Sequence, residues 1–130
     1  MSESNLYKTF KRNWKGYIKR MESSGIGAGF PDCHLVNSKK NDVFLELKYL
    51  AKPFVHKKLY IRNTQLHWFL SYPGRFAYML FKIDKTFYLF NQSVIYDITR
   101  KIKWDDFVSK SCLKTKKCSE VVDFLNNKNS

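Results

Sequence analysis

Two short segments, 33–36 and 42–47, are rich in the apolar and β-branched residues that are typical of β-strands. The polar stretch Asn37–Asn41 separates them and has the composition of a turn. The pattern therefore predicts a β-hairpin. If this hairpin is symmetric about Lys39, residues pair when their numbers sum to 78.

The rest of the chain predicts helices and a second hairpin. Apolar residues recur at helical spacing from Leu6 to Met21, which predicts an amphipathic helix. A helix over 63–72, an aromatic-rich hairpin over 75–90 and short helices near 104–107 and 119–125 follow. This order predicts an α/β fold with a mixed central β-sheet flanked by helices. In the helix over 63–72, the expected N-cap is Asn63 or Thr64 and the expected buried side is Leu66, Phe69 and Leu70.

A chain of 130 residues has the usual size of one domain and can bury a core without disulfides. We expect a single domain over residues 1–110, followed by a basic C-terminal tail or short helix over 111–130. That tail could bind DNA, support a dimer or fray.

The predicted hairpin brings three chemically active side chains together. Its register places Asp32 directly opposite Glu46, where Cβ atoms are about 4.5 to 5.5 Å apart. Because side chains alternate along a strand, Lys48 lies on the same face as Glu46, whereas Leu45 and Leu47 point to the other face. Two carboxylates and a lysine therefore share one place on the sheet.

Opposed carboxylates repel each other, so this arrangement favours a bound divalent cation. Ligands that are all oxygen, with open positions for water, suit Mg²⁺, and the phosphate oxygens of a substrate complete its coordination. Lys48 could then position or deprotonate the attacking water, or stabilise negative charge on the phosphate. The cluster of Asp32, Glu46 and Lys48 predicts hydrolysis of a nucleic-acid backbone.

The charge of the chain fits the same substrate. It has 24 Lys and Arg against 11 Asp and Glu, a net charge of +13, which is typical of a protein that binds nucleic acid. The N-terminal amphipathic pattern could also lie on an anionic membrane, but in so small a domain its apolar side is better used to cover the sheet. The expected DNA-binding residues form two basic clusters, Lys11, Arg12, Lys15, Lys19 and Arg20, and then Lys52, Lys57, Lys58 and Arg62.

Several other classes of protein are disfavoured. The three cysteines include no Cys-x-x-Cys pair, which argues against a zinc ribbon or a disulfide framework; Cys33 is expected to face the core, and Cys112 and Cys118 to be free thiols. The chain has no long apolar run and no signal-peptide pattern. We therefore expect an intracellular protein with no membrane and no organic cofactor.

The motif Pro31-Asp32, followed by Glu46-Leu47-Lys48, resembles that of the PD-(D/E)xK nuclease superfamily. The flanking residues 20–25 and 29–32, together with Gln65 on a helix, resemble the small phage-type branch related to VRR-NUC domains and archaeal Holliday junction resolvases. This resemblance implies a restriction-endonuclease-like core, and a homodimer would suit paired cuts across a junction such as the related resolvases make. The richness in Lys and Asn and the small size suggest a phage source.

The resemblance also implies roles for individual residues. Asp32 and Glu46 would bind Mg²⁺ or Mn²⁺, and the main-chain carbonyl of Leu47 would add a ligand. Lys48 would be catalytic, and Gln65 would point toward the active site. An accessory acidic residue at the metal is expected to be Glu22, with Glu3 as the second candidate.

The leading functional hypothesis is a Mg²⁺-dependent DNA endonuclease that selects branched or junction DNA. Within the nuclease class, a sequence-specific homing-type endonuclease or a nickase is the alternative. From a different class, a noncatalytic nucleic-acid-binding module could keep the fold, although such a module gains nothing from buried carboxylates beside a phosphate. In the plainest alternative, Glu46 and Lys48 form a solvated pair and Asp32 is a turn residue after Pro31.

Overall fold

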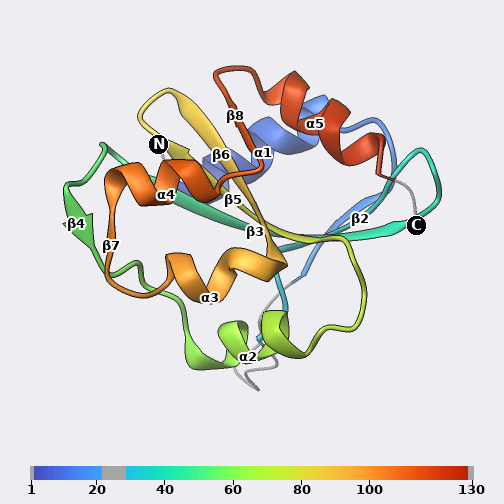
Figure 1. The fold of residues 1–130 in the computed structure, drawn as a ribbon. Coiled ribbons are helices and arrows are strands. Elements are labelled where there is room, and N and C mark those ends of the chain that lie inside the picture. Colours follow the sequence, from blue (N-terminus) through green and yellow to red (C-terminus); the bar gives the residue numbers. More distant parts are fainter. Residues whose placement is uncertain (1, 22–28, 129–130) are drawn as a thin grey trace.

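A six-stranded mixed β-sheet forms the centre of the computed structural model, which describes residues 2–21 and 29–128 (Figure 1). The strand order is β1-β2-β3-β5-β6-β8, in which β3 and β5 run parallel and the other neighbours antiparallel. The strands are β1 (Ile18–Arg20), β2 (Cys33–Val36), β3 (Asp42–Leu50), β5 (Ala77–Ile83), β6 (Thr86–Asn91) and β8 (Leu113–Thr115).

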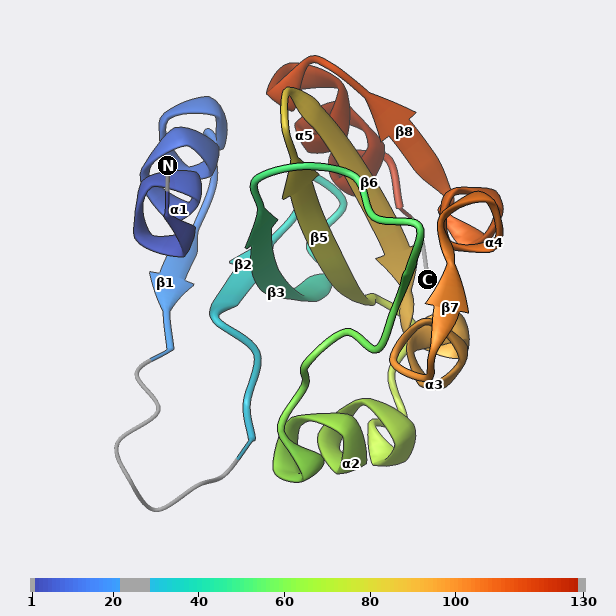
Figure 2. The ribbon, with the colours of Figure 1, turned by 90° about the vertical axis from the view of Figure 1, so that its left-hand side faces the viewer.

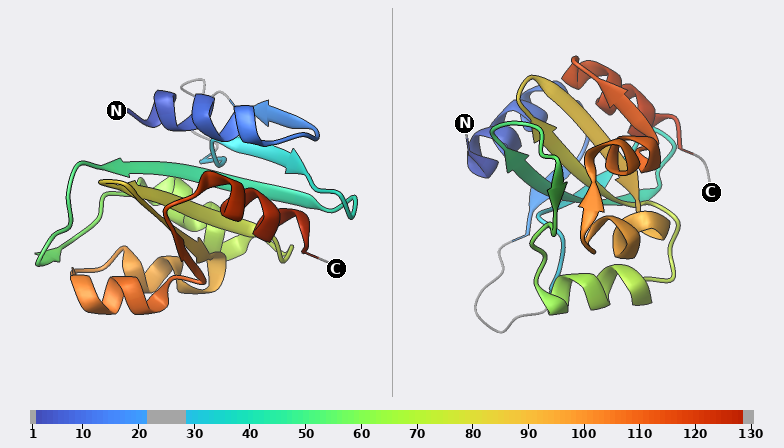
Figure 3. Two further views of the ribbon diagram at one scale, coloured as in Figure 1. Left: turned by 90° about the horizontal axis from the view of Figure 1, so that it is seen from above. Right: turned by 60° about the vertical axis from the view of Figure 1, so that its left-hand side comes forward.

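Helices cover both faces of this sheet. The helices α1 (Glu3–Asn13) and α5 (Cys118–Asn126) lie on one face, and α2 (Asn63–Ser71), α3 (Ile95–Ile98) and α4 (Trp104–Lys110) lie on the other (Figures 1 and 3). A 3-10 turn, η1 (Gln92–Val94), precedes α3. A separate two-stranded sheet pairs β4 (His56–Lys57) with β7 (Ile102–Lys103). The predicted fold class is confirmed.

The core consists of two apolar clusters, one on each face of the sheet. On β5, Tyr78 and Leu80 pack under α1 and α5, whereas the alternate residues Met79 and Phe81 pack under α2, α3 and α4. The alternation follows from the strand period of two. Because both faces are covered, the central strands are apolar on both sides, and a polar side chain inside them stands out.

The hairpin of β2 and β3 has the predicted register. Cys33 pairs with Leu45 and His34 with Phe44, so paired numbers sum to 78. Leu45 and Leu47 are fully buried on the side of α1 and α5. Glu46 and Lys48 therefore lie on the other side, where α2 covers the sheet.

The N-terminal helix is shorter than predicted. It ends at Asn13, and Lys19 and Arg20 belong to β1, an edge strand that pairs with β2 (Figure 2). Trp14 already has an extended backbone, and Gly16 is a poor helix former. The apolar residues after Gly16 thus continue the helical spacing by coincidence, and their β-branched and aromatic side chains suit a strand.

The predicted helix over 63–72 is present as α2, with two differences. Arg62, not Asn63 or Thr64, is the N-cap residue and makes no side-chain capping bond. Leu70 was expected to be buried but is 58% exposed, because the buried line of α2 runs through Gln65 and Phe69, one turn apart.

The C-terminal segment is part of the sheet and of one core cluster. β8 pairs with β6, and Val121, Val122 and Leu125 of α5 are buried against α1. The side chain of Asn37, in the β2–β3 turn, donates hydrogen bonds of 3.0 Å to the carbonyls of Leu125 and Lys128. Residues 113–126 thus form the last strand and helix of the fold. In the described ranges, no helix is long and apolar enough to cross a membrane.

Candidate active site

The β2–β3 hairpin brings Asp32 and Glu46 into direct contact. Asp32 stands immediately before β2, and its main-chain N–H donates to Glu46 Oε1 at 3.1 Å. In return, the main-chain N–H of Leu47 donates to Asp32 Oδ2 at 2.8 Å. In these two bonds a carboxylate oxygen takes the place of the main-chain carbonyl that would accept in a regular antiparallel strand pair. Each carboxylate is therefore held by the backbone of the opposite strand.

The first turn of α2 covers one side of the site. Gln65 is buried, and its Nε2 donates to Glu46 Oε2 at 3.0 Å. Gly29 lies directly against this turn of α2. It has a positive φ of 67°, and a Cβ there would lie 2.3 Å from the carbonyl oxygen of Thr64. Only glycine allows the segment before Asp32 to approach α2 so closely.

Lys48 completes the group, with its Nζ 3.4 Å from Glu46 Oε2. The Glu46 side chain is 2% exposed and that of Lys48 is 16% exposed. We call Asp32, Glu46, Lys48 and Gln65 the carboxylate site. The structure brings all four predicted side chains together, although their roles stay predictions.

Burial makes the two carboxylates reluctant to ionise together. Desolvation, and then repulsion from Asp32, raise the pKa of Glu46 to about 7, against the opposing attraction of Lys48. Desolvation also raises the pKa of Asp32, although the hydrogen bond from Leu47 and the positive charge of Lys48 oppose it. A bound cation would relieve both the desolvation and the repulsion.

One buried atom supports an additional ligand at this site. Gln65 Oε1 is buried and has no hydrogen-bond partner among the described residues. An unsatisfied buried acceptor is costly, and a cation or its coordinated water would satisfy it. Two carboxylate groups and an amide oxygen are the hard oxygen donors that Mg²⁺ prefers. The residues present therefore fit a divalent cation.

No third acidic residue joins the pair in the part of the chain that is described, where no cluster of three His, Cys, Asp or Glu could hold a metal. Glu22, the expected accessory ligand, lies outside the described residues. Glu3 is an exposed residue in the first turn of α1, where its charge suits the positive end of the helix. The Leu47 N–H donates to Asp32, and in a strand the carbonyl of a residue points to the same side as its N–H. The Leu47 carbonyl, the predicted main-chain ligand, therefore points to the side of Asp32.

The two predicted basic clusters reach the site through one arginine each. The charges of Arg20 and Arg62 both act to lower the pKa of Asp32. Lys52, by contrast, follows a strand that continues to Leu50, so the chain carries it past the carboxylates. The other predicted DNA-binding residues, Lys11, Arg12, Lys15, Lys19, Lys57 and Lys58, are exposed.

Part of the basic surface lies outside the two clusters predicted from the sequence. β7 places Lys103 opposite His56 of β4, and Arg100 and Lys101 are exposed just before β7. The pairing of β4 with β7 thus places Lys57 and Lys103, both exposed, on one basic surface. The signal was the basic run Arg100-Lys101-Ile102-Lys103, which only tertiary pairing joins to residues 56–58.

Comparisons with known proteins agree with this architecture. The sequence matches no protein-family model and no curated protein. Among solved structures, the chain is similar to Hjc, a Holliday junction resolvase from Archaeoglobus fulgidus, an archaeal hyperthermophile, with a TM-score of 0.59 and 18% sequence identity. The match covers 95% of this chain and 97% of that chain. The fold is therefore that of an Hjc-type resolvase over almost its whole length.

Proposed function

We propose that this protein is a metal-dependent DNA endonuclease that hydrolyses phosphodiester bonds in branched or junction DNA. The observation that carries the proposal is the reciprocal hydrogen bonding across the hairpin, in which the Asp32 N–H donates to Glu46 Oε1 and the Leu47 N–H donates to Asp32 Oδ2, with Lys48 Nζ 3.4 Å from Glu46 Oε2. The similarity to a Holliday junction resolvase supports the choice of substrate.

Mg²⁺ is the proposed cofactor, and Mn²⁺ is expected to substitute for it. Asp32 and Glu46 would hold the ion, and the Leu47 carbonyl and Gln65 Oε1 are further oxygen donors on the same side. When bound, such an ion polarises a phosphate oxygen and lowers the pKa of water. Glu22 stays a prediction as an accessory ligand.

The side chains of this protein would orient the reactants and stabilise charge. The Asp32 N–H and the Gln65 amide hold Glu46 in one orientation, and the Leu47 N–H holds Asp32. In hydrolysis, water adds to phosphorus, one phosphorus–oxygen ester bond breaks, and negative charge grows on the phosphate oxygens. The Lys48 ammonium, which contacts Glu46 Oε2 and is more exposed than Glu46, would donate a hydrogen bond to those oxygens.

The positive surface would bind the DNA backbone. Arg20 pairs with Cys33, the neighbour of Asp32, and Arg62 is the N-cap residue of α2, whose Gln65 contacts Glu46. Phosphates that flank the scissile bond would be held there. A homodimer, with two such sites, would make paired cuts across a junction.

Cleavage of a panel of labelled DNAs tests the proposal. The panel contains linear duplex, single strand, flap, four-way junction and supercoiled plasmid, each with Mg²⁺ or with EDTA. We expect Mg²⁺-dependent cutting of flaps or junctions that Lys48→Ala lowers by about 10²- to 10³-fold. His67→Ala, an exposed change on α2, is the control.

Each alternative gives a different result in the same experiment. Cutting at rare plasmid sites alone would indicate a homing-type enzyme. Cutting of a single strand of each substrate would indicate a nickase. Tight binding without cleavage of any substrate would contradict the proposal and favour a noncatalytic binding module.

A further inference from the structure

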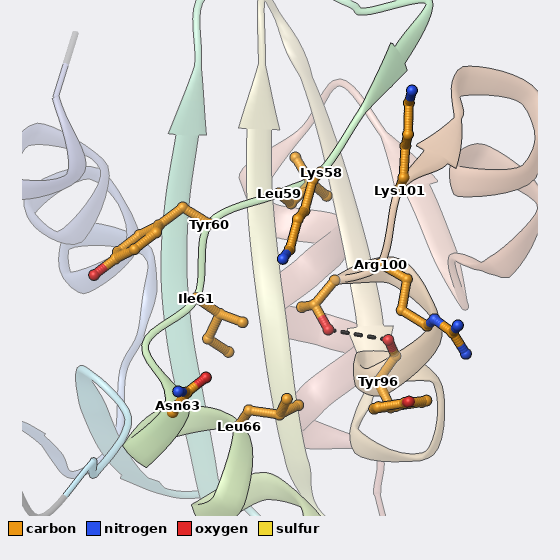
Figure 4. A pocket seen from close by; sticks show the side chains of 10 residues that line it. Lys58, Leu59, Tyr60, Ile61, Asn63, Leu66, Tyr96, Arg100 and Lys101 are labelled. Carbon is orange, nitrogen blue, oxygen red and sulfur yellow. Dashed lines mark hydrogen bonds between the residues drawn. The ribbon is translucent and has the colours of Figure 1, made fainter.

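A groove of about 750 Å³ borders α2 next to the carboxylate site (Figure 4). One wall is the segment 58–61 that leads into α2, and the other consists of α3 and the residues that follow it. The apolar side chains of Leu59, Ile61 and Leu66 line it and belong to the core cluster under α2, α3 and α4. The groove thus has a firm apolar floor.

The charged side chains at this groove all have one sign. Lys58, Arg100 and Lys101 line it and are exposed, and no Asp or Glu lines it among the described residues. In Figure 4 the Lys58 ammonium points between the two walls. The charge therefore selects an anionic occupant.

Two tyrosines give the groove exposed aromatic surface. Tyr96, on the wall formed by α3, is 46% exposed; Tyr60, on the other wall, is 77% exposed and its ring is turned away from Tyr96 (Figure 4). The Arg100 guanidinium carbon lies 5.4 Å from the centroid of the Tyr96 ring. Thr99 Oγ1 donates to the Tyr96 carbonyl at 3.0 Å, which holds the end of α3 in place. We call this feature the Tyr60–Tyr96 groove.

We propose that the Tyr60–Tyr96 groove binds an unpaired, single-stranded segment of the DNA substrate. Duplex DNA presents phosphates to a protein surface and leaves exposed rings and an apolar floor unused. A single strand offers both phosphates for Lys58, Arg100 and Lys101 and base faces that stack on tyrosine. Cations interleaved with exposed aromatic rings are the combination that such strands require.

The groove and the carboxylate site meet on one helix. Leu66 lines the groove and Gln65, the preceding residue, contacts Glu46. A strand in the groove would therefore enter beside the scissile phosphate. This inference rests on the proposed nuclease function, and it specifies the substrate as DNA with an unpaired arm next to the cut.

Binding measured without metal tests the groove separately from cleavage. Fluorescence anisotropy of the full chain in EDTA would use a labelled oligothymidylate and a blunt duplex. We expect Tyr96→Ala to weaken oligothymidylate binding by at least about fivefold, because loss of one stacked base costs that much or more. Tyr96→Phe should bind nearly as wild type, and duplex binding should be unchanged. The control, Tyr17→Ala, removes a tyrosine of similar exposure, 51%, from another surface.

Crosslinking locates the strand. An oligonucleotide that contains bromodeoxyuridine, irradiated on the protein, should crosslink at Tyr60 or Tyr96. Crosslinks found only elsewhere, or an equal loss of duplex and single-strand affinity in Tyr96→Ala, would overturn the proposal. Single-strand binding in the groove by a protein that cuts no DNA would support the groove and contradict the nuclease function. Metal-dependent cleavage with no effect of Tyr96→Ala on single-strand binding would support the nuclease function and contradict the groove proposal.

Discussion

The carboxylate site and the Tyr60–Tyr96 groove both border α2, yet their charges are held in opposite ways. Glu46 is 2% exposed, and each of its oxygens contacts a specific donor. Lys58 and Lys101 are exposed side chains at the rim of the groove. Buried charges depend on each partner, whereas exposed charges are screened by salt and act in small increments. Single changes should therefore have large effects in the carboxylate site and small ones in the groove.

The largest effect is expected from Asp32→Asn. This variant keeps an oxygen for the Leu47 N–H but loses one charge for the cation. We expect cleavage to fall by about a thousandfold or more, because a metal supplies several kcal/mol of transition-state stabilisation. The melting temperature in EDTA should rise, because the repulsion between Asp32 and Glu46 is removed. Wild-type cleavage by this variant would exclude Asp32 from the metal site.

A smaller loss is expected from Gln65→Leu, which removes the amide that orients Glu46. Changes of this kind typically lower metal affinity by about 10- to 100-fold. A Mg²⁺ titration of cleavage measures it, with His67→Ala on the exposed side of α2 as the matched control. An unchanged Mg²⁺ requirement would show that Gln65 only fills space.

The pH dependence of stability, compared between wild type and Glu46→Gln, tests the raised pKa of Glu46. In the metal-free protein its pKa is about 7, above the ordinary value of 4.5, so the folded state binds more protons than the unfolded state between these values. Its contribution to stability is therefore fully present below about pH 4.5 and is lost as the pH rises to about 7. Thermal unfolding in EDTA should show Glu46→Gln gaining stability over wild type from pH 5 to pH 8, by up to about 3 kcal/mol. A constant difference would mean that the pKa is ordinary.

The smallest effects are expected on the β4–β7 surface. Lys57→Ser and Lys103→Ser should each weaken duplex binding only a few-fold in EDTA, and lower the slope of log affinity against log salt by about 0.9 per lost phosphate contact. Lys114→Ser, on the exposed side of the edge strand β8, should leave the slope unchanged. Equal slopes in all three variants would place the DNA elsewhere.

Contacts between residues close in the sequence could be predicted, whereas contacts between distant segments could not. Asp32, Glu46 and Lys48 lie on one hairpin, where turn length and a period of two determine the register, so their meeting was predictable. Residues 56–58 and 100–103 pair only in the tertiary structure, and the groove between Tyr60 and Tyr96 has no local pattern. The predicted helix extends past Gly16, beyond the observed end at Asn13, because a strand of three residues, β1, is too short to show its own period.

The most direct test of the central claim is a crystal structure of the protein soaked with Mn²⁺, using anomalous scattering to locate the ion. The account predicts an anomalous peak between the carboxylates of Asp32 and Glu46, beside Leu47 and Gln65, that is absent in crystals of Asp32→Asn. Metal-dependent cleavage together with an anomalous peak at any other position would contradict the assignment of the active site.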